Sequence, residues 1–168
     1  MISGKFILPS IFFLISTASS YKKPVGGADG IYIFHMTSST SNDPIIEYLG
    51  PANFTTTVLS GPSQRKDSGV HCEQNVFFST DDMNKAISGL ASFFGTGNAF
   101  YAKSVSSYYG SAVAFGCNYG NGQHMDANFF IQEQNLINNK CGSGRGGWSS
   151  HESWKSSYGR TSASKSFC

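Results

Sequence analysis

The clearest pattern of hydrophobic and polar positions predicts a helix over residues 79–95. Apolar side chains recur there at intervals of three and four residues, which places them on one helix face: Met83, Ala86, Ile87, Leu90, Ala91 and Phe94. Ser79 or Thr80 can cap the first turn of this helix, and Gly95 can end it. A second, less regular helix is predicted over residues 126–140, with Asp126 as its N-cap.

Strands are predicted where β-branched and aromatic residues cluster between turn residues. The ranges are 30–36, 53–61, 70–78, 98–107 and 111–118, and the last residues of the polar C-terminal tail can form a closing strand. Along 111–118 the period of two places Val113, Phe115 and Cys117 on one face. The glycine-rich stretch after that strand, residues 118–123, is interpreted as a turn.

The order of these elements from residue 68 to residue 168 is βαββαβ. This order is typical of the ferredoxin-like split βαβ fold, an α+β sandwich with an antiparallel sheet and both helices on one face. Residues 21–67 precede it and are expected to form an N-terminal β-hairpin extension. The chain is thus expected to carry one sandwich domain over residues 68–168.

Residues 1–20 have the character of a secretory signal peptide. Lys5 precedes the apolar run FILPSIFFLI, and the small residues STASS follow it. We expect cleavage near Ser20 and an extracellular location. The apolar run is too short to span a bilayer, so no membrane anchor is expected.

Four cysteines in a small exported chain predict two disulfides, for which three connectivities exist. In the βαββαβ topology the second helix separates Cys117 from Cys141 by about 20 Å, too far for a disulfide. The topology therefore favours Cys72–Cys141 and Cys117–Cys168. Asn53 opens an Asn-Phe-Thr sequon and is a candidate N-glycosylation site.

Charge and motif content narrow the functional classes. The chain has 12 Lys and Arg against 10 Asp and Glu, a net charge of +2, so electrostatic binding of nucleic acid or anionic lipid is not expected. No metal-ligand spacing occurs, and Gly-x-Ser-x-Gly is absent. Neither a metal nor another cofactor is expected.

The block from Ala112 to Cys168 carries AFGCNYGNG, a helix ending in CG, then GW, KSSYGR and a terminal FC. This block resembles small cysteine-containing, effector-like secreted proteins of filamentous fungi. Many of those proteins have a further cysteine after the Cys-Asn-Tyr segment, where this chain has GNGQHMD. The element order is similar in layout to killer-toxin-like and necrosis-inducing fungal effectors. The resemblance implies an extracellular monomer that contacts a host or competitor protein or a cell-wall glycan, and it brings no catalytic residue with it.

Three functions remain open on the sequence. The leading hypothesis is a non-enzymatic effector or toxin-like binding protein, whose interaction surface we place at three tail aromatics with two arginines at the rim: Trp148, Trp154, Tyr158, Arg145 and Arg160. The first alternative is a small secreted ribonuclease, which would use histidines and a carboxylate from His71, Glu73, His124 and His151. The second is a cell-wall carbohydrate-binding protein that uses the same aromatic tail.

Overall fold

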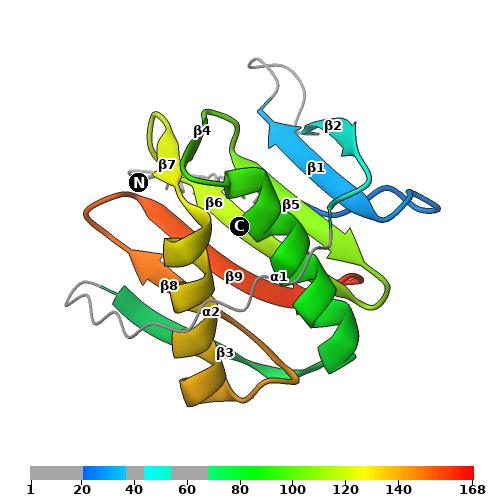
Figure 1. Cartoon of the computed structure of the whole chain (residues 1–168), viewed down its shortest axis with the longest axis vertical. Helices are drawn as coiled ribbons and strands as arrows, with labels where there is room; N and C mark the ends of the chain where they lie inside the picture. Colours follow the sequence, from blue (N-terminus) through cyan, green and yellow to red (C-terminus); the bar gives the residue numbers. More distant parts are fainter. Residues whose placement is uncertain (1–20, 37–43, 54–67) are drawn as a thin grey trace, which may run out of the picture.

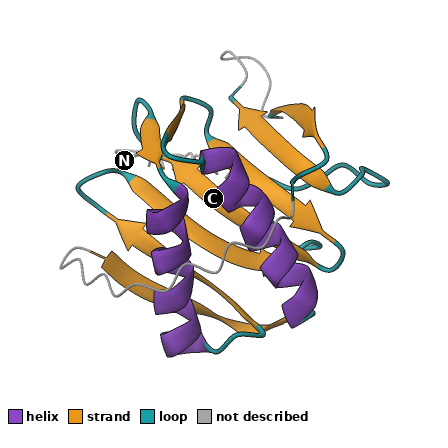
Figure 2. Cartoon of the chain, in the orientation of Figure 1, coloured by secondary structure: helices purple, strands orange, loops and turns teal. Residues whose placement is uncertain are grey.

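The computed structural model describes residues 21–36, 44–53 and 68–168, and these form an antiparallel sheet with helices on one face (Figures 1 and 2). In spatial order its seven strands are β2 (Ile45–Gly50), β1 (Gly30–His35), β5 (Ser104–Tyr109), β6 (Ala112–Asn118), β9 (Ser156–Ser162), β8 (Arg145–His151) and β3 (Ser68–Phe77). The helices are α1 (Thr80–Phe94) and α2 (Ala127–Cys141), and a small separate sheet pairs β4 (Asn98–Phe100) with β7 (Gln123–Met125). Neither helix in these described ranges is both long and apolar enough to cross a membrane.

Both predicted helices are confirmed, together with their capping residues. The Ser79 side chain accepts a hydrogen bond from the Asp82 N–H at 3.3 Å, and Asp126 Oδ1 accepts one from the Phe129 N–H at 2.8 Å. Both helices end at a glycine with positive φ, 55° at Gly95 and 95° at Gly142. Local sequence signals are therefore enough to set both helices.

The sheet is buried on both faces around β6. Ala112 and Ala114 face the helices and contact the larger core, whereas Val113, Phe115 and Cys117 face an aromatic layer on the other side. That layer consists of Tyr21, Tyr32, Phe34, Tyr108 and Phe167 together with those three residues of β6. The predicted shared face of the strand is confirmed, and every residue of β6 is buried because the strand is central.

The α+β class, the antiparallel sheet and the two helices on one face are confirmed, but the order of six elements is not. The expected single closing strand is a hairpin, β8–β9, and the expected strand over 98–107 is divided into β4 and β5. The hairpin lies between β6 and β3, so the strand that precedes α1 is an edge strand. A ferredoxin-like order, in which that strand lies inside the sheet, is not confirmed.

The N-terminal extension contains a hairpin, but its second strand is β2 rather than the range predicted. Most of the predicted strand 53–61 lies outside the described residues, and β2 occupies residues for which no strand was expected. Strand β1 pairs with β5 as well as with β2. The extension is therefore continuous with the main sheet, because its backbone groups complete the β5 ladder.

The predicted disulfide pairing is confirmed. Cys72 is bonded to Cys141 with their Cα atoms 5.4 Å apart, and Cys117 is bonded to Cys168 with their Cα atoms 5.7 Å apart. The first bond ties the edge strand β3 to the end of α2. The second fixes the C-terminus beneath the aromatic layer, which fits an oxidising compartment.

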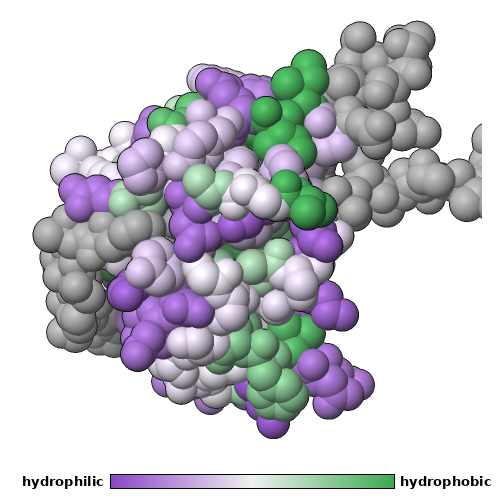
Figure 3. All heavy atoms as spheres, turned by 90° about the vertical axis from the view of Figure 1, so that its right-hand side faces the viewer, coloured by the Kyte–Doolittle hydropathy of each residue, from purple (hydrophilic) through white to green (hydrophobic). Residues whose placement is uncertain are grey.

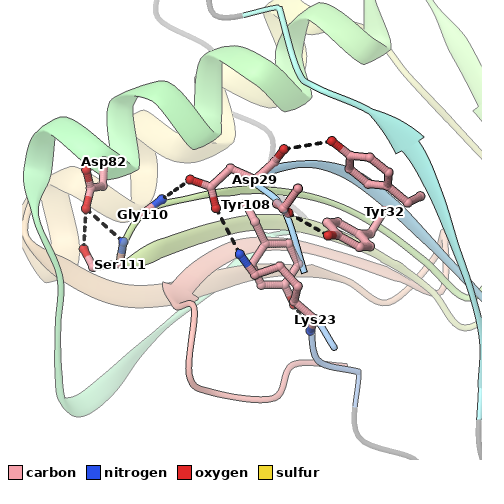
Figure 4. Close-up of polar contacts among 9 residues, drawn as sticks. Lys23, Asp29, Tyr32, Asp82, Tyr108, Gly110 and Ser111 are labelled. Carbon is pink, nitrogen blue, oxygen red and sulfur yellow. Dashed lines mark hydrogen bonds and ion pairs between the residues drawn. The ribbon is translucent and has the colours of Figure 1, made fainter. Parts of the chain in front are cut away.

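The N-terminal segment is hydrogen-bonded to the turn between β5 and β6 (Figure 4). Asp29 Oδ2 accepts a hydrogen bond from the Gly110 N–H at 2.8 Å, and Asp29 Oδ1 pairs with Lys23 Nζ at 3.0 Å. The backbone N–H of Lys23 donates to the Tyr108 hydroxyl at 2.8 Å. These bonds hold the first described residues on the sheet.

The same turn is held from its other side by α1 (Figure 4). Asp82 Oδ2 accepts hydrogen bonds from the Ser111 N–H at 2.9 Å and from the Ser111 hydroxyl at 2.7 Å. These two bonds favour the charged carboxylate and lower the pKa of Asp82 below its ordinary value. The turn is thus fixed between the N-terminal segment and the first turn of α1.

Candidate functional site

The histidine and the carboxylate that lie closest to a catalytic arrangement are buried. His151 Nε2 lies 3.1 Å from Glu133 Oε2, with both side chains at most 2% exposed, and Ser149 Oγ donates a hydrogen bond to the same carboxylate oxygen. In a nucleophilic triad the histidine lies between the serine and the acid. Here the carboxylate lies in the middle, so the histidine cannot take a proton from the serine. The cluster joins α2 to β8 beneath the sheet surface.

His71 and Glu73 do share one face of β3, on the side of the sheet without helices. His71 is exposed; its ring stacks on that of Trp148 at 5.3 Å, and its Nε2 lies 3.2 Å from Ser150 Oγ. Glu73 accepts a hydrogen bond from the Thr161 hydroxyl at 2.5 Å. Within the described residues no hydrogen bond joins His71 to Glu73, so the pair is present without an acid–base contact.

The remaining histidines lie elsewhere. His35 Nε2 pairs with Glu47 Oε2 at 3.2 Å across β1 and β2, and His124 is exposed on β7, with its ring against Gly97. No two of the four histidines share a carboxylate in the described part of the chain. No group of three His, Cys, Asp or Glu side chains that could hold a metal ion occurs among the described residues.

Two residues of the predicted interaction surface are buried, which corrects that prediction. Tyr158 and Arg160 are at most 1% exposed because the period of two along β9 turns both side chains towards the helices. Arg160 donates hydrogen bonds to the carbonyl oxygens of Arg145 and Gly142, at 3.1 and 2.9 Å. Burial lowers the pKa of Arg160 to about 10 and raises that of Tyr158 to about 12.

The other three residues do not form one surface either. Trp148 is half-buried between His71 and the aromatic layer. Arg145 is exposed at the start of β8, with its guanidinium 4.8 Å from the centre of the Phe77 ring. Trp154 lies beyond the other end of β8, in the turn before β9. A strand of this length separates the two exposed residues by about 20 Å.

Trp154 belongs instead to a group of exposed aromatic side chains at one end of the sheet, which we call the aromatic end: Tyr101, Tyr119 and Trp154. Their exposed fractions are 79%, 53% and 39%. They come from three connections, between β4 and β5, between β6 and β7, and between β8 and β9 (Figure 1). Segments that are distant in the sequence thus present aromatic rings at the same end of the fold.

Two buried amides hold these three connections together. Asn118 Nδ2 donates to the carbonyl oxygens of Tyr101 and Ala102, at 3.4 and 3.1 Å, and Gln123 Nε2 donates to that of Trp154 at 2.7 Å. Gln123 Nε2 also donates to Asn118 Oδ1 at 3.3 Å, which joins the two amides. Because buried amides need these partners, the three backbones are held in fixed relative positions.

Each ring is also held by a neighbour. An added Cβ on Gly122 would lie 2.8 Å from the Tyr101 ring, so that ring rests against a glycine with a φ of 143°. The Tyr119 hydroxyl lies 3.1 Å from Ser157 Oγ. Trp154 stacks on His151 with the ring centres 4.9 Å apart and the planes inclined by 15°. The exposed rings are therefore ordered by contacts that leave part of each surface free.

The sequence contained only a partial signal for this site. Trp154 was predicted as an interaction residue, whereas Tyr101 was assigned to a strand and Tyr119 to a glycine-rich turn. The stretch NYGNGQ, residues 118–123, held the information: an aromatic residue between turn glycines, with an amide at each end. Only the fold shows that both amides are buried and bonded to other loops.

A second exposed group lies on the edge strand β2, and Figure 3 shows hydrophobic side chains on this side of the molecule. Ile45, Ile46, Tyr48 and Leu49 are all exposed there. They belong to one strand that precedes residues outside the described ranges. The aromatic end is better defined, because all of its connections are described and tied together.

The predicted glycosylation residue, Asn53, is exposed just after β2, as an acceptor must be. Searches against known proteins add no relative: no family model, no curated protein and no solved structure matches this chain.

Proposed function

We propose that this protein is a secreted, effector-like or toxin-like binding protein that acts on a host or competitor component without catalysis, and that the component docks at the aromatic end. The observation that carries the proposal is the set of exposed but ordered rings of Tyr101, Tyr119 and Trp154. Rings already fixed in position lose little conformational entropy when a partner covers them. Such residues contribute most to binding when they are buried by a partner.

The resemblance of the block from Ala112 to Cys168 to small fungal secreted proteins supports the same proposal. That block contains two of the three rings and both amides of the aromatic end. The distribution of the histidines favours binding over the ribonuclease alternative, since the buried His151–Glu133 pair cannot reach a substrate. The likeness in layout to killer-toxin-like effectors belongs to this proposal as well.

The test measures retention of the fluorescently labelled, purified protein on intact cells of potential hosts and competitors. We expect Trp154→Ala and Tyr119→Ala to reduce retention. The matched control is Phe77→Ala, because Phe77 is an exposed aromatic residue at the opposite end of the sheet, where β3 pairs with Arg145. Equal loss in all three variants would contradict docking at the aromatic end.

The ribonuclease alternative is tested separately with the same preparation. We expect no cleavage of total RNA by the purified protein. Cleavage that is lost in His71→Ala, while the thermal unfolding of that variant is unchanged, would replace the binding function by an enzymatic one.

A further inference from the structure

We infer that the ligand of the aromatic end is a neutral polysaccharide, which stacks on the exposed ring faces of Tyr101 and Trp154. This inference rests on the proposed function and specifies its partner. A pyranose ring presents a flat C–H face that packs on an aromatic ring, and hydroxyl groups at its edge that need neutral donors and acceptors. The described residues offer both.

The ring faces are the first argument. His151 covers one face of Trp154, and the side chain nevertheless remains 39% exposed. The Tyr101 ring rests against Gly122 and is 79% exposed, more than any aromatic ring that sits in a core. Each ring is thus supported from behind and open in front, as a stacking surface requires.

The polar surroundings are the second argument. Between the rings lie a hydroxyl pair, Tyr119 with Ser157, and the exposed amide of Asn121 in the turn between β6 and β7. These groups can both donate and accept hydrogen bonds, as sugar hydroxyls do. The rings are separated by polar residues on three loops, whereas the centre of a protein–protein interface is a continuous apolar patch.

Charge excludes the other stacking ligand. A single-stranded nucleic acid needs a basic groove beside its aromatic platform. This chain has 12 Lys and Arg against 10 Asp and Glu, and the turn that carries Trp154 has both signs, Glu152 and Lys155. A neutral polysaccharide requires no such excess of positive charge.

The experiment is a depletion assay with the purified, disulfide-bonded full chain and four insoluble matrices: chitin, β-glucan, cellulose and, as a matrix without carbohydrate, silica. We expect retention on at least one glycan above that on silica. We also expect added salt to leave it unchanged, because stacking is not screened. Soluble oligosaccharide of the retained glycan should compete.

Variants connect retention to the rings. We expect Trp154→Ala and Tyr101→Ala each to weaken binding about fivefold to tenfold, the value of one aromatic contact. Trp154→Phe should restore part of the loss, and Phe77→Ala should bind as the parent chain does. Gly122→Ala should weaken binding although it removes no aromatic ring, because its Cβ would displace Tyr101.

The outcomes separate this inference from the function on which it rests. No glycan retained above silica, or retention equal in the parent chain and in both alanine variants, overturns the inference. If cells still bind the protein through Trp154 and protease treatment of the cells abolishes this binding, the partner is a protein and only the inference fails. If neither cells nor glycans bind it, both proposals fail.

Discussion

The hydroxyl of Tyr108 accepts a hydrogen bond from the backbone N–H of Lys23 at 2.8 Å, which connects residues 85 positions apart. The Lys23 ammonium also lies 5.3 Å from the centre of the same ring. Tyr108 is fully buried in the aromatic layer. This contact therefore attaches the start of the predicted mature chain to the centre of the sheet.

We expect Tyr108→Phe to destabilise the fold by about 1 to 3 kcal/mol, because the Lys23 N–H loses its acceptor in a partly buried position. The neighbouring substitution Tyr109→Phe is the control. It removes a hydroxyl whose bond to Lys85 Nζ is exposed, so its cost should stay below about 1 kcal/mol. Urea denaturation of both variants measures the difference, and equal costs would contradict this account.

Gly159 is expected to tolerate no side chain. An added Cβ would lie 2.6 Å from the Gly147 carbonyl oxygen and 2.7 Å from the Phe115 ring. We expect Gly159→Ala to cost about 1 to 3 kcal/mol through overpacking. For Gly120→Ala the nearest atom is 3.5 Å away, so thermal unfolding should shift little. A similar shift in both variants would argue against close packing of β9.

The bond between Cys117 and Cys168 closes a loop of 51 residues. Its removal in Cys117→Ala/Cys168→Ala should cost about 4 kcal/mol from loop entropy. A further loss is expected because Phe167, next to Cys168, stacks on Phe115 at 4.6 Å. The double alanine variant of Cys72 and Cys141 opens a loop of similar size, 69 residues. It should therefore be the less destabilised of the two variants in a guanidinium titration.

Alkaline pH should destabilise the protein through its buried phenols. Burial raises the pKa of Tyr158 to about 12 from 10.0 and also raises that of Tyr108. Between these values the unfolded chain loses phenolic protons that the folded chain keeps, so the free energy of unfolding falls as pH rises. Arg160 acts in the opposite direction, because burial lowers its pKa to about 10 and the folded state loses that proton first.

Tyr158→Phe isolates the tyrosine contribution and leaves Arg160 in place. We expect a shallower decline of stability between pH about 10 and about 12 in this variant than in the parent chain. Denaturant titrations at a series of pH values measure the slopes. Identical slopes would show that the phenol of Tyr158 titrates alike in both states.

Where the sequence predictions succeeded, the deciding contacts are local. Ser79 and Asp126 cap helices through bonds to residues three positions away, and the apolar spacing of α1 matches its buried face. The predictions failed in β8 and β9, where serine and glycine replace the usual alternation of apolar and polar residues. These small residues are buried because α2 covers them, which no local pattern indicates.

Arg160 shows the same limit at the level of single residues. A charged side chain near the C-terminus was expected at the surface. In the fold it lies beneath α2, and the carbonyl oxygens of Gly142 and Arg145 satisfy its donors. Such a position depends on where a helix end meets a strand, which is decided by packing between distant segments.

The sequence by itself determined the α+β class, both helices with their caps, and the pairing of the four cysteines, because these depend on short-range spacing and on the length of α2. The tertiary structure decided the strand order, the burial of Tyr158 and Arg160, and the assembly of Tyr101, Tyr119 and Trp154 at one end. Those features arise where loops distant in the sequence meet around Asn118 and Gln123. Their hydrogen bonds form only once the sheet has brought the loops together.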